Sequence, residues 1–208
     1  DVVIAPGMNN FVMPIYRRMR FSLHLWGRSV WVVDVEGLEK LMGQDYTEEE
    51  RVLLTSRRDV KLTEVQISDE LDDEFLMRCA DIPPYDHAVK RDVRFLEWRY
   101  RAHPLTEYIL KSVLNEKGQT IGILAANAER VRDRGERVLR VCEWISDPSG
   151  DAVMLQAVLK LAQTHCAILI DFFSPSTLMG ERLRGLGFLS IEELGETTCG
   201  EGECAKAV

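Results

Sequence analysis

The second half of the chain alternates apolar and polar positions, which is typical of strands that bury one face. The alternation occupies residues 108–115, 120–131 and 137–145, and Gly118 and Gly135 mark the turns between these segments. Because short turns join strands that run in opposite directions, the pattern predicts an antiparallel meander of three strands.

A helix, a strand and a second helix are predicted after the meander. Residues 151–165 and 177–186 carry apolar side chains at helical spacing, and Gly187 marks the end of the second helix. Residues 167–173 are almost all apolar, which predicts a central strand covered on both faces. The predicted fold class is therefore α/β, with an α+β mixed sheet.

The first part of the chain repeats this kind of pattern. Residues 2–6 form a short apolar run that predicts a strand, and residues 11–19 place apolar side chains at every fourth position of a helix. Two further β-prone runs, residues 22–26 and 29–33, flank Gly27 and predict an antiparallel hairpin that turns at this glycine.

A helical segment is predicted between these two parts, over residues 35–90. Thr47 and Glu50 have the spacing of a capping box at a helix start. Ser68 is the expected cap of a second helix in this segment. A further helix is predicted over residues 92–101, because its apolar positions recur at helical spacing.

A strand, a turn and a helix that ends in phenylalanine occur twice in the chain. Residues 168–188 parallel residues 2–21, and short repeats of this kind usually mark duplicated supersecondary units. The chain after residue 188 lacks clear strands, so residues 22–33 could complete the sheet of the second unit. The predicted division is 1–35, the end of a first unit; 36–84, a helical connector; 85–192, a second unit; and 193–208, a flexible tail.

Composition places the chain among ordinary globular proteins. Of its 208 residues, 46% are apolar and 29% are charged, which excludes collagenous, mucin-like and largely disordered chains. No apolar run approaches the roughly 20 residues that span a bilayer, and the first residues lack the basic start of a signal peptide. The net charge is −8 and the cations form no single block, so neither nucleic acid nor a membrane is expected as a partner.

The cysteine pattern argues against disulfides and against a metal site. Five cysteines at wide spacings do not form a disulfide framework, so the expected localisation is cytoplasmic. Cys199 and Cys204 lie in the tail without the further ligands that a zinc site needs. The chain contains no P-loop and no G-x-S-x-G elbow, which argues against NTPase and hydrolase functions.

The order of elements in residues 85–192 resembles the GNAT-type N-acyltransferase superfamily, with a helix, a three-stranded meander, a helix, a strand and a helix that ends in Gly-Phe. Residues 7–21 look like a late motif of that superfamily, which has an Asn near a helix start and a Tyr shortly before a terminal Phe. Residues 91–108 are similar to the opening of the second domain in large bacterial tandem-GNAT proteins. The resemblance covers the larger part of the chain.

The resemblance implies transfer of an acyl group from acetyl-CoA, or another acyl-CoA, to the amine of a small molecule, in a cleft where two strands splay apart. Tyr16 occupies the general-acid position of the late motif, and Glu143 lies on the strand where the family often places a base. Asn9 and Asn10 would help to position the cofactor. The same residues also allow a structural interpretation, in which Tyr16 is a core residue, Asn10 a helix cap and Glu143 a salt-bridged carboxylate.

The coenzyme pyrophosphate would lie against residues 147–152, because backbone amides at a helix start favour an anion. The resemblance implies that Gly150, Asp151 and Ala152 supply these amides. The family pattern has a basic residue or Gln followed by two close glycines, whereas this chain has one glycine and the acids Asp147 and Asp151. Each acid would repel a pyrophosphate 4 Å away by about 1–4 kcal/mol.

Three hypotheses follow from these observations. The first is a fragment of a tandem GNAT-like acyltransferase, in which residues 85–192 are a degenerate second copy. The second is a catalytically inactive GNAT-like scaffold or partner-binding module. The third is a related transferase that accepts a carrier-bound acyl or aminoacyl group. The sequence leaves the acceptor amine, the acyl group and the formation of oligomers open.

Overall fold

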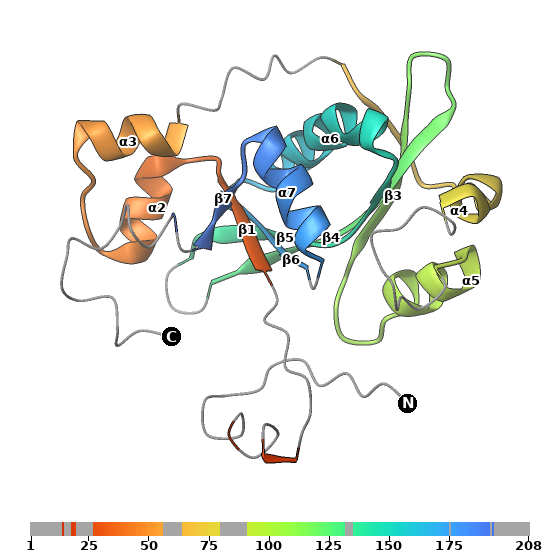
Figure 1. Ribbon diagram of the computed structural model, residues 1–208, viewed down its shortest axis with the longest axis horizontal. Helices are drawn as coiled ribbons and strands as arrows, with labels where there is room; N and C mark the ends of the chain where they lie inside the picture. Colours follow the sequence, from red (N-terminus) through yellow and green to blue (C-terminus); the bar gives the residue numbers. More distant parts are fainter. Residues whose placement is uncertain are drawn as a thin grey trace.

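The architecture comes from a computed structural model, in which the described residues build a sheet of seven strands. The strand order is β2-β3-β4-β5-β6-β1-β7. Figure 1 shows helices on both faces of this sheet. The structure describes residues 27–55, 64–79, 91–131, 135–174, 176–191 and 193, together with Pro14, Arg18 and Met19.

The predicted meander is present. Strands β3 (Ile109–Leu114), β4 (Thr120–Arg130) and β5 (Arg137–Ser146) pair antiparallel in sequence order. Gly118 has a φ of +75°, a left-handed conformation that suits glycine in the tight turn between β3 and β4. The alternation of apolar and polar residues therefore located all three strands to within one or two residues.

The helix, strand and helix that follow are also present. Helix α6 (Asp151–Thr164) connects β5 to β6 (Ala167–Ser174), which pairs parallel with β5. Strand β6 is buried along almost its whole length, as expected for a central strand. Helix α7 (Thr177–Leu186) ends at Gly187, whose φ of +105° gives the left-handed C-terminal cap.

The chain does not turn at Gly27, contrary to the prediction. Gly27 is the first residue of β1 (Gly27–Val32), which runs antiparallel between β6 and β7 (Leu189–Ser190). The first half of the predicted hairpin, residues 22–26, lies outside the described residues. Strand β1 nevertheless completes the sheet of the second unit, because it supplies the neighbour that β6 requires on its second edge (Figure 1).

Among the described residues, the segment between β1 and residue 90 contains three helices and one strand. These are α2 (Val35–Met42), α3 (Glu48–Thr55), β2 (Gln66–Ser68) and α4 (Asp73–Cys79). The capping box at α3 is confirmed, since Thr47 N–H donates to Glu50 over 2.7 Å and Glu50 N–H donates to Thr47 Oγ1 over 3.3 Å.

Ser68 is not a helix cap. It ends β2, which pairs with β3 at the edge of the sheet. The cap of α4 is Asp72, whose carboxylate accepts a hydrogen bond from Phe75 N–H over 2.8 Å. Asp72 is the cap because it directly precedes the first residue of α4. Ser68 lies four residues earlier and is paired with Ser112 of β3.

The predicted helix over residues 92–101 has two parts. Asp92 caps α5 (Val93–Leu96) through Phe95 N–H, and a π-helical turn (Glu97–Arg101) continues it. Tyr100 in this turn is buried against β3 and β4.

The helices divide over the two faces of the sheet. Helices α6 and α7 pack on one face, in a core that contains Trp31, Trp144 and Phe188. On the opposite face α2 and α3 cover one end of the sheet, and α4 and α5 cover the other (Figure 1). Between these two groups, the middle of the second face carries charged and aromatic side chains of β5 and β6.

The division of the chain at residues 35, 84 and 192 stays a prediction. Strands β1 and β2, which lie outside the predicted second unit 85–192, belong to the same sheet as β3–β6. Among the described residues, no helix combines the length and the apolar character needed to cross a membrane.

Candidate functional site

The two parallel strands at the centre of the sheet separate at their carboxyl ends. The ladder between β5 and β6 runs from Arg137 and Ala167 to Val141 and Phe172. Strand β5 then continues to Ser146 without a partner in β6. Helix α6 begins directly after β5, so the opening lies beside a helix start. In α/β sheets, ligands bind at such places, outside the carboxyl ends of the strands.

A β-bulge at Cys142 coincides with this opening. Ala126 pairs with Val141 and Ala125 pairs with Glu143, which leaves Cys142 as an extra residue in β5. The bulge places Cys142 and Glu143 on the same face, whereas strict alternation predicts opposite faces. Trp144 points to the other face, into the core under α6 and α7, as expected.

Glu143 is buried and both of its carboxylate oxygens are occupied. Arg91 Nε donates to Oε2 over 2.6 Å, and the Tyr100 hydroxyl donates to Oε1 over 2.9 Å. Burial, followed by the charge of Glu143, raises the pKa of Tyr100 and raises the pKa of the Cys142 thiol to about 11. The structure therefore gives Glu143 the contacts of a salt-bridged carboxylate, which was the structural alternative, and an incoming amine would have to displace one of them.

In the loop before α6, the Asp147 side chain bonds to the backbone amides of the same loop. Asp147 Oδ1 accepts hydrogen bonds from Ser149 N–H over 2.8 Å and from Gly150 N–H over 3.2 Å. These bonds, led by the one from the Ser149 hydroxyl, lower the pKa of Asp147. The carboxylate of Asp147 thus occupies the amides that the resemblance to the GNAT superfamily assigns to a phosphate oxygen.

Gly150 is required by packing against β4. A Cβ atom at this position would lie 2.8 Å from the carbonyl oxygen of Ile121, which is a clash with backbone. This glycine therefore has a reason to be present that does not involve a ligand.

Asp151 is the centre of a buried polar cluster. Arg182 of α7 binds its carboxylate with two bonds, Nε to Oδ2 over 2.8 Å and Nη2 to Oδ1 over 2.6 Å. The Ser146 hydroxyl and the Trp144 indole N–H also donate to Oδ1, over 2.7 and 3.1 Å. Its charge is therefore compensated inside the protein. Ala152, the neighbouring residue, is exposed in the first turn of α6.

Arg182 was not predicted as a site residue, because nothing in its spacing from Asp151 along the chain indicates a contact across 31 residues.

The three remaining candidates, Tyr16, Asn9 and Asn10, lie outside the described residues. Among the described residues, no group of three or more His, Cys, Asp or Glu side chains is arranged to hold a metal ion.

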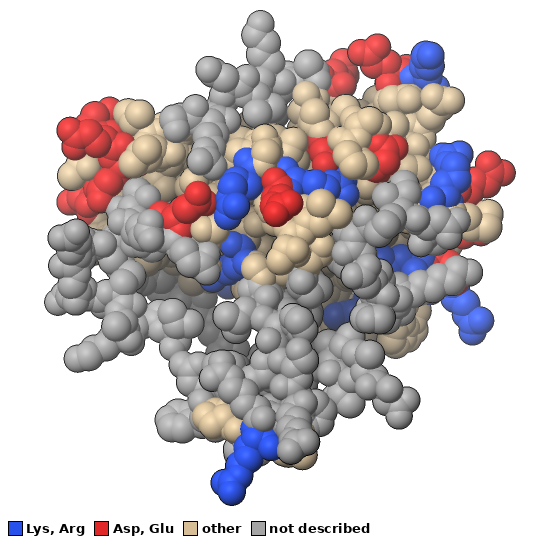
Figure 2. All heavy atoms as spheres, viewed as in Figure 1, with Lys and Arg blue, Asp and Glu red and all other residues tan. Residues whose placement is uncertain are grey.

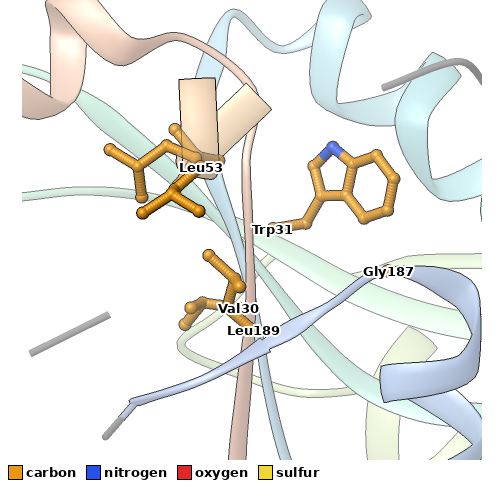
Figure 3. A pocket seen from close by; sticks show the side chains of 7 residues that line it. Val30, Trp31, Leu53, Gly187 and Leu189 are labelled. Atoms are coloured by element: carbon orange, nitrogen blue, oxygen red, sulfur yellow. The ribbon is translucent and has the colours of Figure 1, made fainter. Parts of the chain in front are cut away.

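A small cavity and a groove lie outside the opening. A cavity of about 10 Å³ lies between β1, α3 and β7, lined by Trp31, Leu53 and Leu189 among others (Figure 3). At this size it holds at most one water molecule. A wider groove of about 670 Å³, lined mostly by residues with polar side chains, lies between β2, the β3–β4 turn and α6. No residue of β5 or β6 lines it.

Charges on the face that carries α7 are mixed. Figure 2 shows blue and red side chains interspersed over its described part, and acidic side chains gathered where α3 lies. The residues of this acidic group are Glu48, Glu49 and Glu50.

Comparisons with protein families and with curated proteins find no match to the chain. Among solved structures, Saccharomyces cerevisiae N-myristoyltransferase with bound myristoyl-CoA is similar, with a TM-score of 0.54 at 10% identity over 86% of this chain and 54% of that chain. N-myristoyltransferase is an acyltransferase of the GNAT fold. This chain has a GNAT-type fold.

A conserved protein of unknown function from Staphylococcus epidermidis is also similar, with a TM-score of 0.50 at 8% identity over 88% of this chain. The chain spans 64% of the length of that structure and 54% of the length of the yeast enzyme. At such low identity the likeness establishes the GNAT-type fold and nothing about the reaction. The predicted fold class is confirmed.

Proposed function

We propose that the chain is part of an acyl-CoA-dependent N-acyltransferase, which transfers an acyl group, such as acetyl, to the amine of a small molecule. The observation that carries the proposal is the separation of β5 and β6 beside the start of α6. The GNAT-type fold supports it, and so does the bound myristoyl-CoA of the similar yeast enzyme. The tandem arrangement and the cytoplasmic localisation are part of this proposal.

The opening suits an acyl-CoA for a physical reason. Beyond Val141, the edge of β5 that faces β6 offers backbone N–H and C=O groups that pair with no strand of the described residues. The amide groups of the pantetheine arm can bond to such an edge as an added strand would. The arm would then direct its thioester to the bulge at Cys142, beside the Glu143 carboxylate. Tyr16 is proposed as the general acid that protonates the departing thiolate, with Asn9 and Asn10 as cofactor contacts.

Asp147 is the main obstacle to the coenzyme in this proposal. Its carboxylate occupies the amides of Ser149 and Gly150 and adds negative charge where a pyrophosphate would lie. A pyrophosphate must therefore displace it, which weakens binding.

The same observation favours a second candidate, a GNAT-like scaffold that binds no coenzyme. In a scaffold, the bonds of Asp147 and the ion pair between Asp151 and Arg182 simply fix the loop to α7. The two candidates differ in what should happen when Asp147 is removed.

Isothermal titration with acetyl-CoA and with myristoyl-CoA separates them. For an acyltransferase, Asp147→Ala should tighten binding about tenfold, since one competing charge-assisted contact is lost. The matched control is Glu116→Ala, an exposed acid in the β3–β4 turn, which should leave affinity unchanged. Absence of heat with either acyl-CoA at millimolar concentration, in both wild type and Asp147→Ala, would contradict coenzyme binding and support the scaffold.

A further inference from the structure

Two arginines from different strands meet at one buried carboxylate in the middle of the sheet. Asp171 of β6 is fully buried, and Arg28 of β1 binds it with two bonds, from Nε over 2.7 Å and from Nη2 over 3.2 Å. Arg140 of β5 approaches it from the other side, with Nε 3.4 Å from Oδ2. A buried carboxylate is costly unless cations compensate it, so Asp171 fixes the positions of both guanidinium groups.

The two arginines remain open to solvent although Asp171 does not. Their side chains are 33% and 42% exposed, for Arg28 and Arg140 respectively. Both guanidinium groups lie over the ring of Phe173, 5.0 and 5.8 Å from its centre, and this ring is itself 41% exposed. Both guanidinium groups are fixed by the buried Asp171 and are accessible to solvent on their other side. This fixed, accessible arrangement is suited to binding an anion.

The arginine pair, defined as Arg28 and Arg140, lies at the base of the opening. The last pair of the ladder between β5 and β6 is Val141 with Phe172. Arg140 and Asp171 form the pair before it, and Phe173 is the first residue of β6 after it. Arg140 precedes Glu143 by three residues on β5, roughly 10 Å of extended strand. A small molecule can therefore contact the arginine pair while its amine reaches the bulge.

One nitrogen of each arginine is unused. Among the described residues, Arg28 Nη1 and Arg140 Nη2 make no hydrogen bond or ion pair, whereas Arg140 Nε forms the ion pair with Asp171. In the part of the chain that the structure describes, Glu129 also contacts the arginine pair: its carboxylate lies 3.3 Å from Arg140 Nη1, and its side chain is 43% exposed. The two unused nitrogens are open to solvent, so they can make charge-assisted hydrogen bonds to an anionic group.

We propose that the arginine pair binds an anionic group, carboxylate or phosphate, of the acceptor amine. This inference rests on the proposed function and narrows its substrate class to small amines that carry a negative charge. Phe173 supplies an apolar surface for the part of the molecule between the anion and the amine.

Matched acceptor pairs test the proposal. The pairs are 6-aminohexanoate with 6-aminohexanamide, for a carboxylate, and 6-aminohexyl phosphate with 6-aminohexan-1-ol, for a phosphate. Their chains are long enough to reach from the arginine pair toward the bulge. One readout is acyl transfer, followed by release of the coenzyme thiol from acetyl-CoA. The other is isothermal titration of the same amines without acyl-CoA, which does not depend on turnover.

The anionic member of at least one pair should bind about tenfold more tightly and show a correspondingly lower KM, as expected for a charge-assisted contact. Arg140→Gln should remove this preference and leave the neutral amine unchanged, and Arg28 still compensates Asp171 in this variant. Glu129→Gln should strengthen anion binding, because it removes the competing acid. Arg130→Gln, which changes an exposed arginine at the end of β4, is the control.

Equal binding of both members of both pairs, or an equal loss of both in Arg140→Gln, would overturn the anion site. Anion binding that Arg140→Gln removes, without transfer to any amine, would leave the site standing and overturn the proposed function. Acyl transfer without any preference for the anionic amine would support the proposed function and overturn the anion site.

Discussion

Buried acids explain much of this structure at the scale of single residues. Glu143, Asp151 and Asp171 lie at or near the carboxyl ends of the central strands, where the backbone ladder stops. Each is bound by an arginine from a segment far away in the sequence: Arg91 just before α5, Arg182 of α7 and Arg28 of β1 respectively. Removing a carboxylate from water is unfavourable unless a cation and hydrogen bonds replace the solvent, so these pairs determine which elements can pack together.

The strongest of these pairs should be Asp151 with Arg182, because both side chains are largely buried and the contact has two bonds. We expect Arg182→Ala to lower the free energy of unfolding by about 3–5 kcal/mol, since it leaves a buried carboxylate without its cation. Urea denaturation followed by circular dichroism measures the loss.

Arg184→Ala is the matched control for that experiment. Arg184 lies two residues further along α7 and is exposed, so its loss should change stability by no more than about 0.5 kcal/mol. If the two variants lose the same amount, the ion pair has no special role in joining α6 to α7.

At the scale of elements, the sequence predicted more of the fold than of the site. The strand and helix patterns between residues 108 and 186 are regular, and the structure follows them closely. Strand β2 was missed because three residues are too few for a periodic signal. The turn at Gly27 was wrong, because the partners of β1 are β6 and β7, which lie more than 130 residues away along the chain.

The candidate site could be located from sequence but its contacts could not. Residues 147–152 were predicted to lie at the junction of the third strand and the following helix; residues 147–150 connect β5 to α6, and Asp151 and Ala152 are the first residues of α6. The bulge at Cys142 was missed, because bulges depend on pairing with the neighbouring strand rather than on local sequence. The partners of Asp151 were missed for the same reason, since Arg182 reaches it only after α7 has packed.

A helix cap gives a prediction at this scale that depends on pH. Phe75 N–H, which bonds to the carboxylate, holds the pKa of Asp72 below its usual value. Because the folded pKa is lowered, the stabilisation is present above the unfolded value near about 3.9 and is lost as the pH falls through the folded pKa. Asp72→Ala should therefore cost about 1 kcal/mol at pH 7, and less below about pH 4.

Urea titrations of wild type and Asp72→Ala at several pH values test this. Helix α4 buries Phe75 and Leu76 in the core, so weakening its cap should lower the stability of the whole fold. Glu116→Ala is an exposed control with no expected effect. A difference between wild type and Asp72→Ala that stays constant from pH 7 to pH 3 would contradict the assigned role of the carboxylate.

At the scale of the whole molecule, the sheet joins segments from opposite ends of the described chain. Strand β1 covers the edge of β6, and β7 returns to pair with β1. Phe188, directly before β7, packs its ring against Trp31 of β1 and Trp144 of β5, with ring centres 5.5 and 6.3 Å apart. The opening between β5 and β6 is thus supported from one side by residues that arrive from far away in sequence.

Trp31 is the residue in β1 whose loss should reveal this dependence. It is buried beside Phe188 and lies opposite Ile170 of β6, so Trp31→Ala removes a large side chain from the principal core. We expect a loss of about 3–5 kcal/mol in the free energy of unfolding.

Trp98→Ala is the control. It removes a side chain that is 67% exposed and should lower the free energy of unfolding by no more than about 0.5 kcal/mol. Both variants retain the buried Trp144, so fluorescence reports unfolding in each. Equal losses of stability in the two variants would mean that β1 does not support the centre of the sheet. If β1 does support it, removing the largest buried side chain of β1 must lower the free energy of unfolding.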